Sequence, residues 1–129
     1  MTATFKRCVL ACYLSVLMFM SLNPWVRPES GGDIWWDKID HAVAYAGLAI
    51  LVFSCSKRAK VWHVRSAVAA WPSAMMISFL IGAALEIAQS VLTVNRSGSL
   101  ADVAANAMGV LLGFVVFMFA RFVYVKWSY

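Results

Sequence analysis

Residues 100–125 read LADVAANAMGVLLGFVVFMFARFVYV, an apolar run with Asp102 near its start and Arg121 near its end. A transmembrane helix needs about 20 predominantly apolar residues, so this run is long enough to cross a bilayer. Three further apolar runs lie at about residues 5–22, 39–56 and 67–92. The sequence therefore predicts an all-α, polytopic integral membrane protein, with four transmembrane helices in a compact bundle.

The composition supports this class. The 129 residues are 63% hydrophobic and only 13% charged. A soluble domain averages about 45–50% apolar and about 25% charged residues. No internal repeat or linker interrupts the chain, so residues 1–129 are expected to form one membrane domain.

The basic residues predict the orientation of the bundle. Eight of the eleven lie before the first run, between the second and third runs, or at the end of the fourth: Lys6, Arg7, Lys57, Arg58, Lys60, Arg65, Arg121 and Lys126. We expect the protein in the inner or plasma membrane of the cell. The positive-inside rule then places these segments, and hence both termini, in the cytoplasm. The net charge of +5 then reflects topology and attraction to anionic lipid, and no nucleic-acid partner is expected.

The acidic residues and the tryptophans fit the same orientation. All six acidic residues fall in or near the outer half: Glu29, Asp33, Asp37, Asp40, Glu86 and Asp102. Tryptophan is enriched at membrane interfaces. The outer interface is expected at Trp25, Trp35 and Trp36, and the inner interface at Trp62, Trp71 and Trp127.

Polar residues recur at helical spacing in three of the four predicted helices. Residues four apart share a helix face, and three such stripes occur: Asp37, His41 and Tyr45; Ser78, Gly82, Glu86 and Gln89; Asp102, Asn106, Gly109 and Gly113. The two glycines of the last stripe form a GxxxG element, which allows a neighbouring helix to approach closely. The polar part of each stripe lies toward the outer end. We therefore predict a polar pocket between these three helices that opens outward.

Two segments resemble the signatures of the VanZ-like membrane proteins. DKIDHAVAYAGL matches DK-x-x-H-x-x-x-[YF]-x-x-L, and the later segment matches G-x-x-x-E-x-x-Q, then R, then SLAD-x-x-x-N-x-x-G-x-x-x-G. The motif positions are Asp37, Lys38, His41, Tyr45, Gly82, Glu86, Gln89, Arg96, Asp102, Asn106, Gly109 and Gly113. The resemblance covers about residues 37–115, and Tyr45 stands where Phe is common. It implies a bacterial cell-envelope protein connected with resistance to the glycopeptide teicoplanin, but it supplies no biochemical activity.

Most of these residues also have structural interpretations. Asp37 could be the N-cap of the second helix, and Ser99 with Asp102 has the spacing of a capping box. Lys38 could extend to the lipid headgroups. The remaining interpretations are side-chain packing for His41, interhelical hydrogen bonds for Tyr45, Gln89 and Asn106, and a salt bridge between Glu86 and Arg96.

The favoured functional hypothesis is binding of an amphipathic envelope component, such as a lipid-linked substrate. Arg96 would hold a phosphate or carboxylate, because its guanidinium matches these groups bidentately. Glu86, Asp102 and His41 would complete the site for the polar head. The apolar helix faces would accept an acyl or prenyl chain.

Two alternatives remain open. In a membrane enzyme, the candidate catalytic residues are Glu86, Asp102 and His41, which with Asp37 could also bind a divalent cation. The sequence contains no HExxH, GxSxG or Walker motif, so neither a reaction nor a particular metal can be named. In a scaffold protein, the polar residues would only lock the bundle together.

Overall fold

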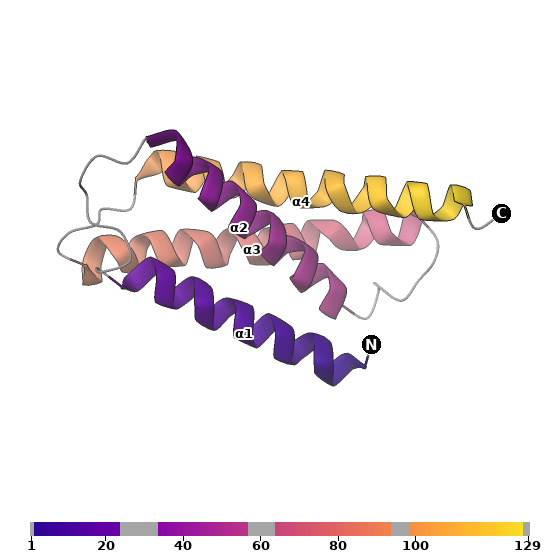
Figure 1. Ribbon diagram of the computed structural model, residues 1–129, viewed down its shortest axis with the longest axis horizontal. Helices are drawn as coiled ribbons and strands as arrows, with labels where there is room; N and C mark the ends of the chain where they lie inside the picture. Colours follow the sequence, from indigo (N-terminus) through magenta and orange to yellow (C-terminus); the bar gives the residue numbers. More distant parts are fainter. Residues whose placement is uncertain (1, 24–33, 57–63, 94–98, 128–129) are drawn as a thin grey trace.

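The structure, a computed structural model, describes residues 2–23, 34–56, 64–93 and 99–127 (Figure 1). These ranges contain four helices: α1 (Ala3–Leu22), α2 (Ile34–Cys55), α3 (Val64–Leu92) and α4 (Leu100–Trp127). Each helix is long and apolar enough to cross a membrane. The predicted all-α bundle of four transmembrane helices is confirmed, and the chain is a multi-pass membrane protein.

Successive helices run in opposite directions along the bundle (Figure 1). The ends of α1 and α3 therefore lie beside the beginnings of α2 and α4. The beginning of α1 and the end of α4 lie together at the opposite end of the bundle. This antiparallel order brings Asp37, Gln89 and Asp102 to one end of the molecule, although they are far apart in the sequence.

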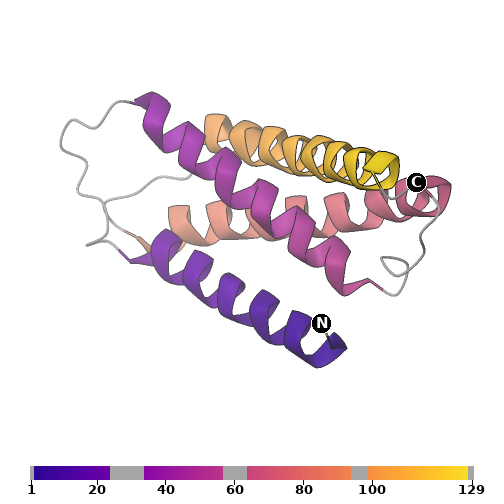
Figure 2. The same cartoon turned by 45° about the vertical axis from the view of Figure 1, so that its right-hand side comes forward.

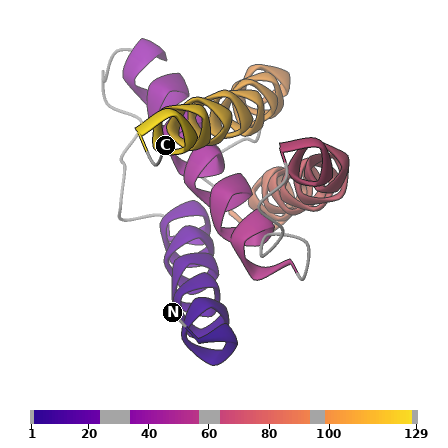
Figure 3. The ribbon, with the colours of Figure 1, turned by 90° about the vertical axis from the view of Figure 1, so that its right-hand side faces the viewer.

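Helix α2 is the centre of the bundle. It contacts all three other helices, most extensively α4, whereas α1 contacts only α2 and α3 among the described residues. Helix α1 lies to one side of the other three (Figures 2 and 3). It buries none of its residues completely. Helices α2, α3 and α4 therefore form the packed unit, and α1 is a peripheral helix.

The close contact between α2 and α4 depends on the GxxxG element. A Cβ atom placed on Gly109 would lie 2.2 Å from the backbone oxygen of Ala42, and one on Gly113 would lie 2.6 Å from that of Ala46. Ordinary contacts of a Cβ atom begin at 3.4 Å. Small residues on both helices thus allow the two backbones to touch, as the sequence predicted.

An aromatic core fills the end of the bundle opposite the polar stripes. The rings of Phe53 and Trp71 are stacked with centroids 4.6 Å apart, and Phe117 contacts both rings. Trp71 is only 1% exposed, so its ring packs inside the bundle, while the predicted level of this residue at the inner interface stays a prediction. Because α3 begins at Val64, Trp71 lies two turns inside the helix, where its large apolar surface is buried.

The predicted beginning of the second helix is wrong. Helix α2 begins at Ile34 rather than at about residue 39, so Asp37 lies in its first turn and is not its N-cap. Helices α1, α3 and α4 likewise extend by a few residues beyond the predicted runs. Hydropathy indicates where a helix enters the apolar layer, whereas backbone hydrogen bonding continues through the charged residues outside it.

Candidate functional site

Six polar side chains from three helices meet at the end of the bundle where α2 and α4 begin. We call them the polar cluster: Asp37, Lys38, His41, Glu86, Asp102 and Asn106. Glu86 is 5% exposed, Asp102 is 6% exposed and Asn106 is 1% exposed. The structure thus brings together the polar stripes that the sequence placed on separate helices.

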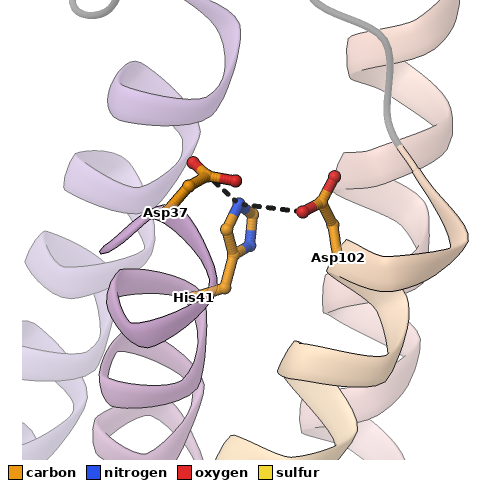
Figure 4. Close-up of side chains that lie close together, drawn as sticks. All are labelled: Asp37, His41 and Asp102. Atoms are coloured by element: carbon orange, nitrogen blue, oxygen red, sulfur yellow. Dashed lines mark ion pairs between the residues drawn. The ribbon is translucent and has the colours of Figure 1, made fainter. Parts of the chain in front are cut away.

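His41 lies at the centre of the polar cluster. Its Nδ1 atom is 2.9 Å from Oδ1 of Asn106 and 3.5 Å from Oε1 of Glu86. Its Nε2 atom faces the other way and lies 4.0 Å from Oδ1 of both Asp37 and Asp102 (Figure 4). One imidazole ring therefore connects α2 with both α3 and α4.

Lys38 supplies a positive charge to the same group. Its Nζ atom donates a hydrogen bond of 3.0 Å to Oδ2 of Asp37 and another to Oδ1 of Asp102. The second bond joins α2 to α4. Lys38 therefore lies within the polar cluster and holds two carboxylates near each other.

Asp102 caps the start of α4 and also contacts α2. The Ser99 backbone N–H donates to Oδ2 of Asp102 over 3.0 Å, and the Asp102 backbone N–H donates to the Ser99 hydroxyl over 3.2 Å. These reciprocal bonds are a capping box at the start of α4, as the sequence predicted. The other carboxylate oxygen, Oδ1, remains directed toward Lys38 and His41. Capping therefore orients the carboxylate toward α2.

Glu86 is the least satisfied member of the polar cluster. Its Oε1 atom accepts a hydrogen bond of 3.4 Å from Nδ2 of Asn106. Its Oε2 atom is buried and has no hydrogen-bond partner among the described residues. A buried polar atom without a partner is costly, so it commonly indicates a bound group or a functional role. Arg96, the partner that the sequence suggested, lies outside the described residues.

Tyr45 and Gln89 lie next to the polar cluster. The Tyr45 ring is buried and lies parallel to that of His41, with centroids 6.4 Å apart. A Cβ atom on Gly82 would lie 2.8 Å from the Tyr45 ring, which explains the small residue at this point of α3. Gln89 is buried on α3, one turn beyond Glu86. Tyr45 therefore packs next to His41 on α2, and Gln89 lies next to Glu86 on α3.

A pocket of about 440 Å³ adjoins the polar cluster between α1 and α2. Its lining is mainly apolar, with a polar end: Tyr13, Val16, Leu17, Met20, Val43, Ala44 and Tyr45, then Ser21, Asp37, Asp40 and His41. Asp37 and His41 belong to both the pocket and the polar cluster. The sequence predicted a pocket among the last three helices, whereas this pocket is lined, among the described residues, only by residues of α1 and α2, so the predicted pocket stays a prediction.

One signal in the sequence could have indicated the contribution of α1. Tyr13, Leu17 and Ser21 recur every four residues, which places them on one face of α1. In the structure, the Tyr13 hydroxyl donates a hydrogen bond of 2.8 Å to the backbone oxygen of Ala44 and fixes α1 against α2. Because few residues of that face are polar, the stripe is hard to recognise in an otherwise apolar helix.

Comparison with known proteins identifies the family of the chain. The model of the VanZ/LLP1 family matches residues 8–121, from the first part of α1 to the last part of α4. No match is found among curated proteins or among solved structures. Because the family match covers most of the sequence and includes every residue of the polar cluster, the chain belongs to the VanZ/LLP1 family.

Proposed function

We propose that this VanZ-family membrane protein binds an amphipathic component of the cell envelope. The polar head of the ligand would lie at the polar cluster, and its hydrocarbon chain would lie in the pocket between α1 and α2. The observation that carries this proposal is the pocket of about 440 Å³, which has apolar walls and shares Asp37 and His41 with the polar cluster. Ligand pockets typically have volumes of about 300–1,000 Å³.

The loose packing of α1 supports a chain-binding role. Helix α1 has no fully buried residue and does not contact α4 among the described residues. Its apolar side chains Val16, Leu17 and Met20 line the pocket, and of these Leu17 also packs against the core. Since lipid tails are as apolar as these side chains, a chain could replace bilayer contacts here with little penalty.

The positive-inside pattern supports an outward orientation of the polar end, in a bacterial plasma membrane with both termini in the cytoplasm. The beginning of α1 and the end of α4 lie at the same end of the bundle, which is consistent with this topology. The polar cluster would then face the compartment in which envelope components are assembled. Altered susceptibility to teicoplanin is the phenotype that the family resemblance suggests.

We further propose that the polar head carries a phosphate or a carboxylate. Arg96 is the proposed partner, because a guanidinium binds such groups bidentately. In the sequence it precedes Ser99 by three residues, and Ser99 contacts the Asp102 side chain of the polar cluster. Glu86, Gln89, Lys38 and Tyr45 would shape the surroundings of the head.

The proposal can be tested with a dodecyl phosphate that carries a photoreactive group in its chain. Substitution of Val43 by Trp would fill the pocket and should reduce photolabelling of the purified protein at least fivefold. Val116→Trp is the matched control, because Val116 lies on the exposed surface of α4 and does not line the pocket. Equal labelling of the wild type and both variants would contradict a specific chain site.

Glu86 and His41 favour one second candidate function. A buried carboxylate 3.5 Å from an imidazole nitrogen is a pair capable of general acid–base catalysis. In a membrane enzyme acting on a lipid-linked substrate, Glu86, Asp102 and His41 would be the catalytic residues. Glu86→Gln would then abolish turnover of the lipid-linked substrate but keep photolabelling. If the site only binds, the wild type itself would show no turnover.

A further inference from the structure

Three members of the polar cluster have the spacing of metal ligands. Asp37, His41 and Asp102 each offer one ligand atom, and these atoms all lie within 4.8 Å of one another. The two distances of 4.0 Å from Nε2 of His41 to the carboxylates exceed hydrogen-bond length. They suit ligands that share one ion, because ligand bonds of roughly 2.0–2.6 Å place two ligands up to about 5 Å apart.

The orientation of the imidazole ring also fits a metal ligand. The Nδ1 atom of His41 faces the side-chain oxygen of Asn106 at 2.9 Å, and donation of the Nδ1–H to that acceptor leaves a lone pair on Nε2. This lone pair points toward the carboxylates of Asp37 and Asp102 (Figure 4). Metal-binding histidines typically donate their other ring N–H to a carbonyl or carboxylate in this way.

Glu86 provides a separate observation that points to a ligand. Glu86 is only 5% exposed, and its Oε1 atom lies 3.5 Å from Nδ1 of His41. Its Oε2 atom has no hydrogen-bond partner within the part of the chain that the structure describes. This third, buried carboxylate adds negative charge to the polar cluster. A nearby cation stabilises this charge.

Lys38 shows that this position attracts a cation. Its ammonium group bridges Asp37 and Asp102, two of the three potential ligands. A divalent ion bound to the same two carboxylates would displace the ammonium group, whose side chain is long enough to move away. We propose that Asp37, His41 and Asp102 form a binding site for a divalent cation, with Glu86 on the other side of the imidazole ring, and that Lys38 competes with this cation.

The donor set narrows the class of metal. One imidazole nitrogen and two carboxylates suit ions such as Mn²⁺, Zn²⁺ and Fe²⁺, and there is no thiolate among them to favour a soft ion. The three cysteines lie elsewhere, at Cys8, Cys12 and Cys55.

The metal site adds to the proposed function a reason for binding an anionic head group. In this respect it rests on the proposed function. The polar end of the pocket contains Asp37 and Asp40, which repel a phosphate. A divalent cation beside them would offset most of this negative charge and could bind a phosphate oxygen directly. Cation binding itself requires no amphiphile, and it is therefore measured separately.

The test is titration of the purified full-length protein, freed of metal by a chelator, with Mn²⁺ alone. The EPR signal of free Mn²⁺ disappears as the ion binds, and one site per chain is expected. Asp102→Asn and His41→Ala should each weaken Mn²⁺ binding at least tenfold. Lys38→Met should strengthen it several-fold, a gain that a misfolded protein could not produce.

A matched control removes the same charge outside the site. Lys6→Met removes a lysine that bonds the Ser54 backbone oxygen at the other end of the bundle. It should bind Mn²⁺ as the wild type does. Equal affinity in the wild type, Asp102→Asn and His41→Ala would overturn the metal site, as would absence of binding in both the wild type and Lys38→Met.

Photolabelling with the dodecyl phosphate separates the two proposals. If Mn²⁺ binds as expected but Val43→Trp leaves labelling unchanged, the metal site stands and the proposed function fails. If labelling depends on Val43 but no variant changes Mn²⁺ binding, the proposed function stands and the metal site is overturned.

Discussion

Substitution of Gly109 by Ala should separate α2 from α4 and disturb the polar cluster at a distance. The new Cβ atom would lie 2.2 Å from the Ala42 backbone oxygen, about 1.2 Å short of the 3.4 Å at which ordinary contacts begin. The obstructing atom belongs to the backbone, so no side-chain rotation can relieve the clash. Helix α2 must move away from α4 by about 1 Å.

The cost of this movement can be estimated from the structure. Overpacking of a tight contact costs about 1–3 kcal/mol, and a backbone clash lies at the upper end of that range. The movement also displaces His41, which precedes Ala42 and lies 2.9 Å from Asn106 of α4. A displacement of this size stretches that hydrogen bond beyond its useful length. The expected loss of stability is therefore about 3 kcal/mol, which is a fall in Tm on the order of 10 °C.

Thermal unfolding in detergent measures the loss, and Mn²⁺ titration measures the disturbance of the cluster. Gly47→Ala is the matched control, because its new Cβ would lie 2.6 Å from Oη of Tyr13, the end of a side chain on the peripheral helix α1. It should cost less than about 1 kcal/mol. Wild-type melting of Gly109→Ala, or a larger loss in Gly47→Ala, would refute the close α2–α4 contact.

Three further substitutions test other parts of the structure by thermal unfolding. Ser99→Ala removes the hydroxyl that caps α4 and should cost about 1 kcal/mol; an unchanged Tm would contradict the capping box. Trp71→Ala removes a buried ring and should cost about 3–5 kcal/mol. Trp127→Ala, at a residue 86% exposed, is its control and should cost little. Tyr13→Phe removes the bond to Ala44 and should cost about 0.6 kcal/mol, while a loss above about 2 kcal/mol would indicate a different role for the hydroxyl.

The sequence was sufficient to predict the four helices because the length of an apolar run is a physical requirement of the bilayer. It did not predict where α2 begins, since hydrogen bonding within a helix continues past the apolar layer to Ile34. Nor did it predict that the Trp71 ring is buried. The stacking of this ring on Phe53 joins two helices, and the spacing within one helix cannot show such a contact.

The polar cluster was predictable to the extent that helical periodicity determines it. Spacing placed Asp37 with His41 and Asp102 with Asn106, and the GxxxG element indicated a close helix contact. The spacing within each helix could not show which atoms meet, such as Nδ1 of His41 and Oδ1 of Asn106. Nor could it show that α1 forms a wall of the pocket, because a largely apolar helix gives no sign of its neighbour.

The most direct test of the account is to identify, by mass spectrometry, which residues of the wild-type protein are labelled by the photoreactive dodecyl phosphate. The account predicts that labels concentrate on pocket residues of α1 and α2 such as Leu17, Met20 and Val43. Labels spread over the exposed lipid-facing surface of α4, at residues such as Val116 and Phe119, would contradict it.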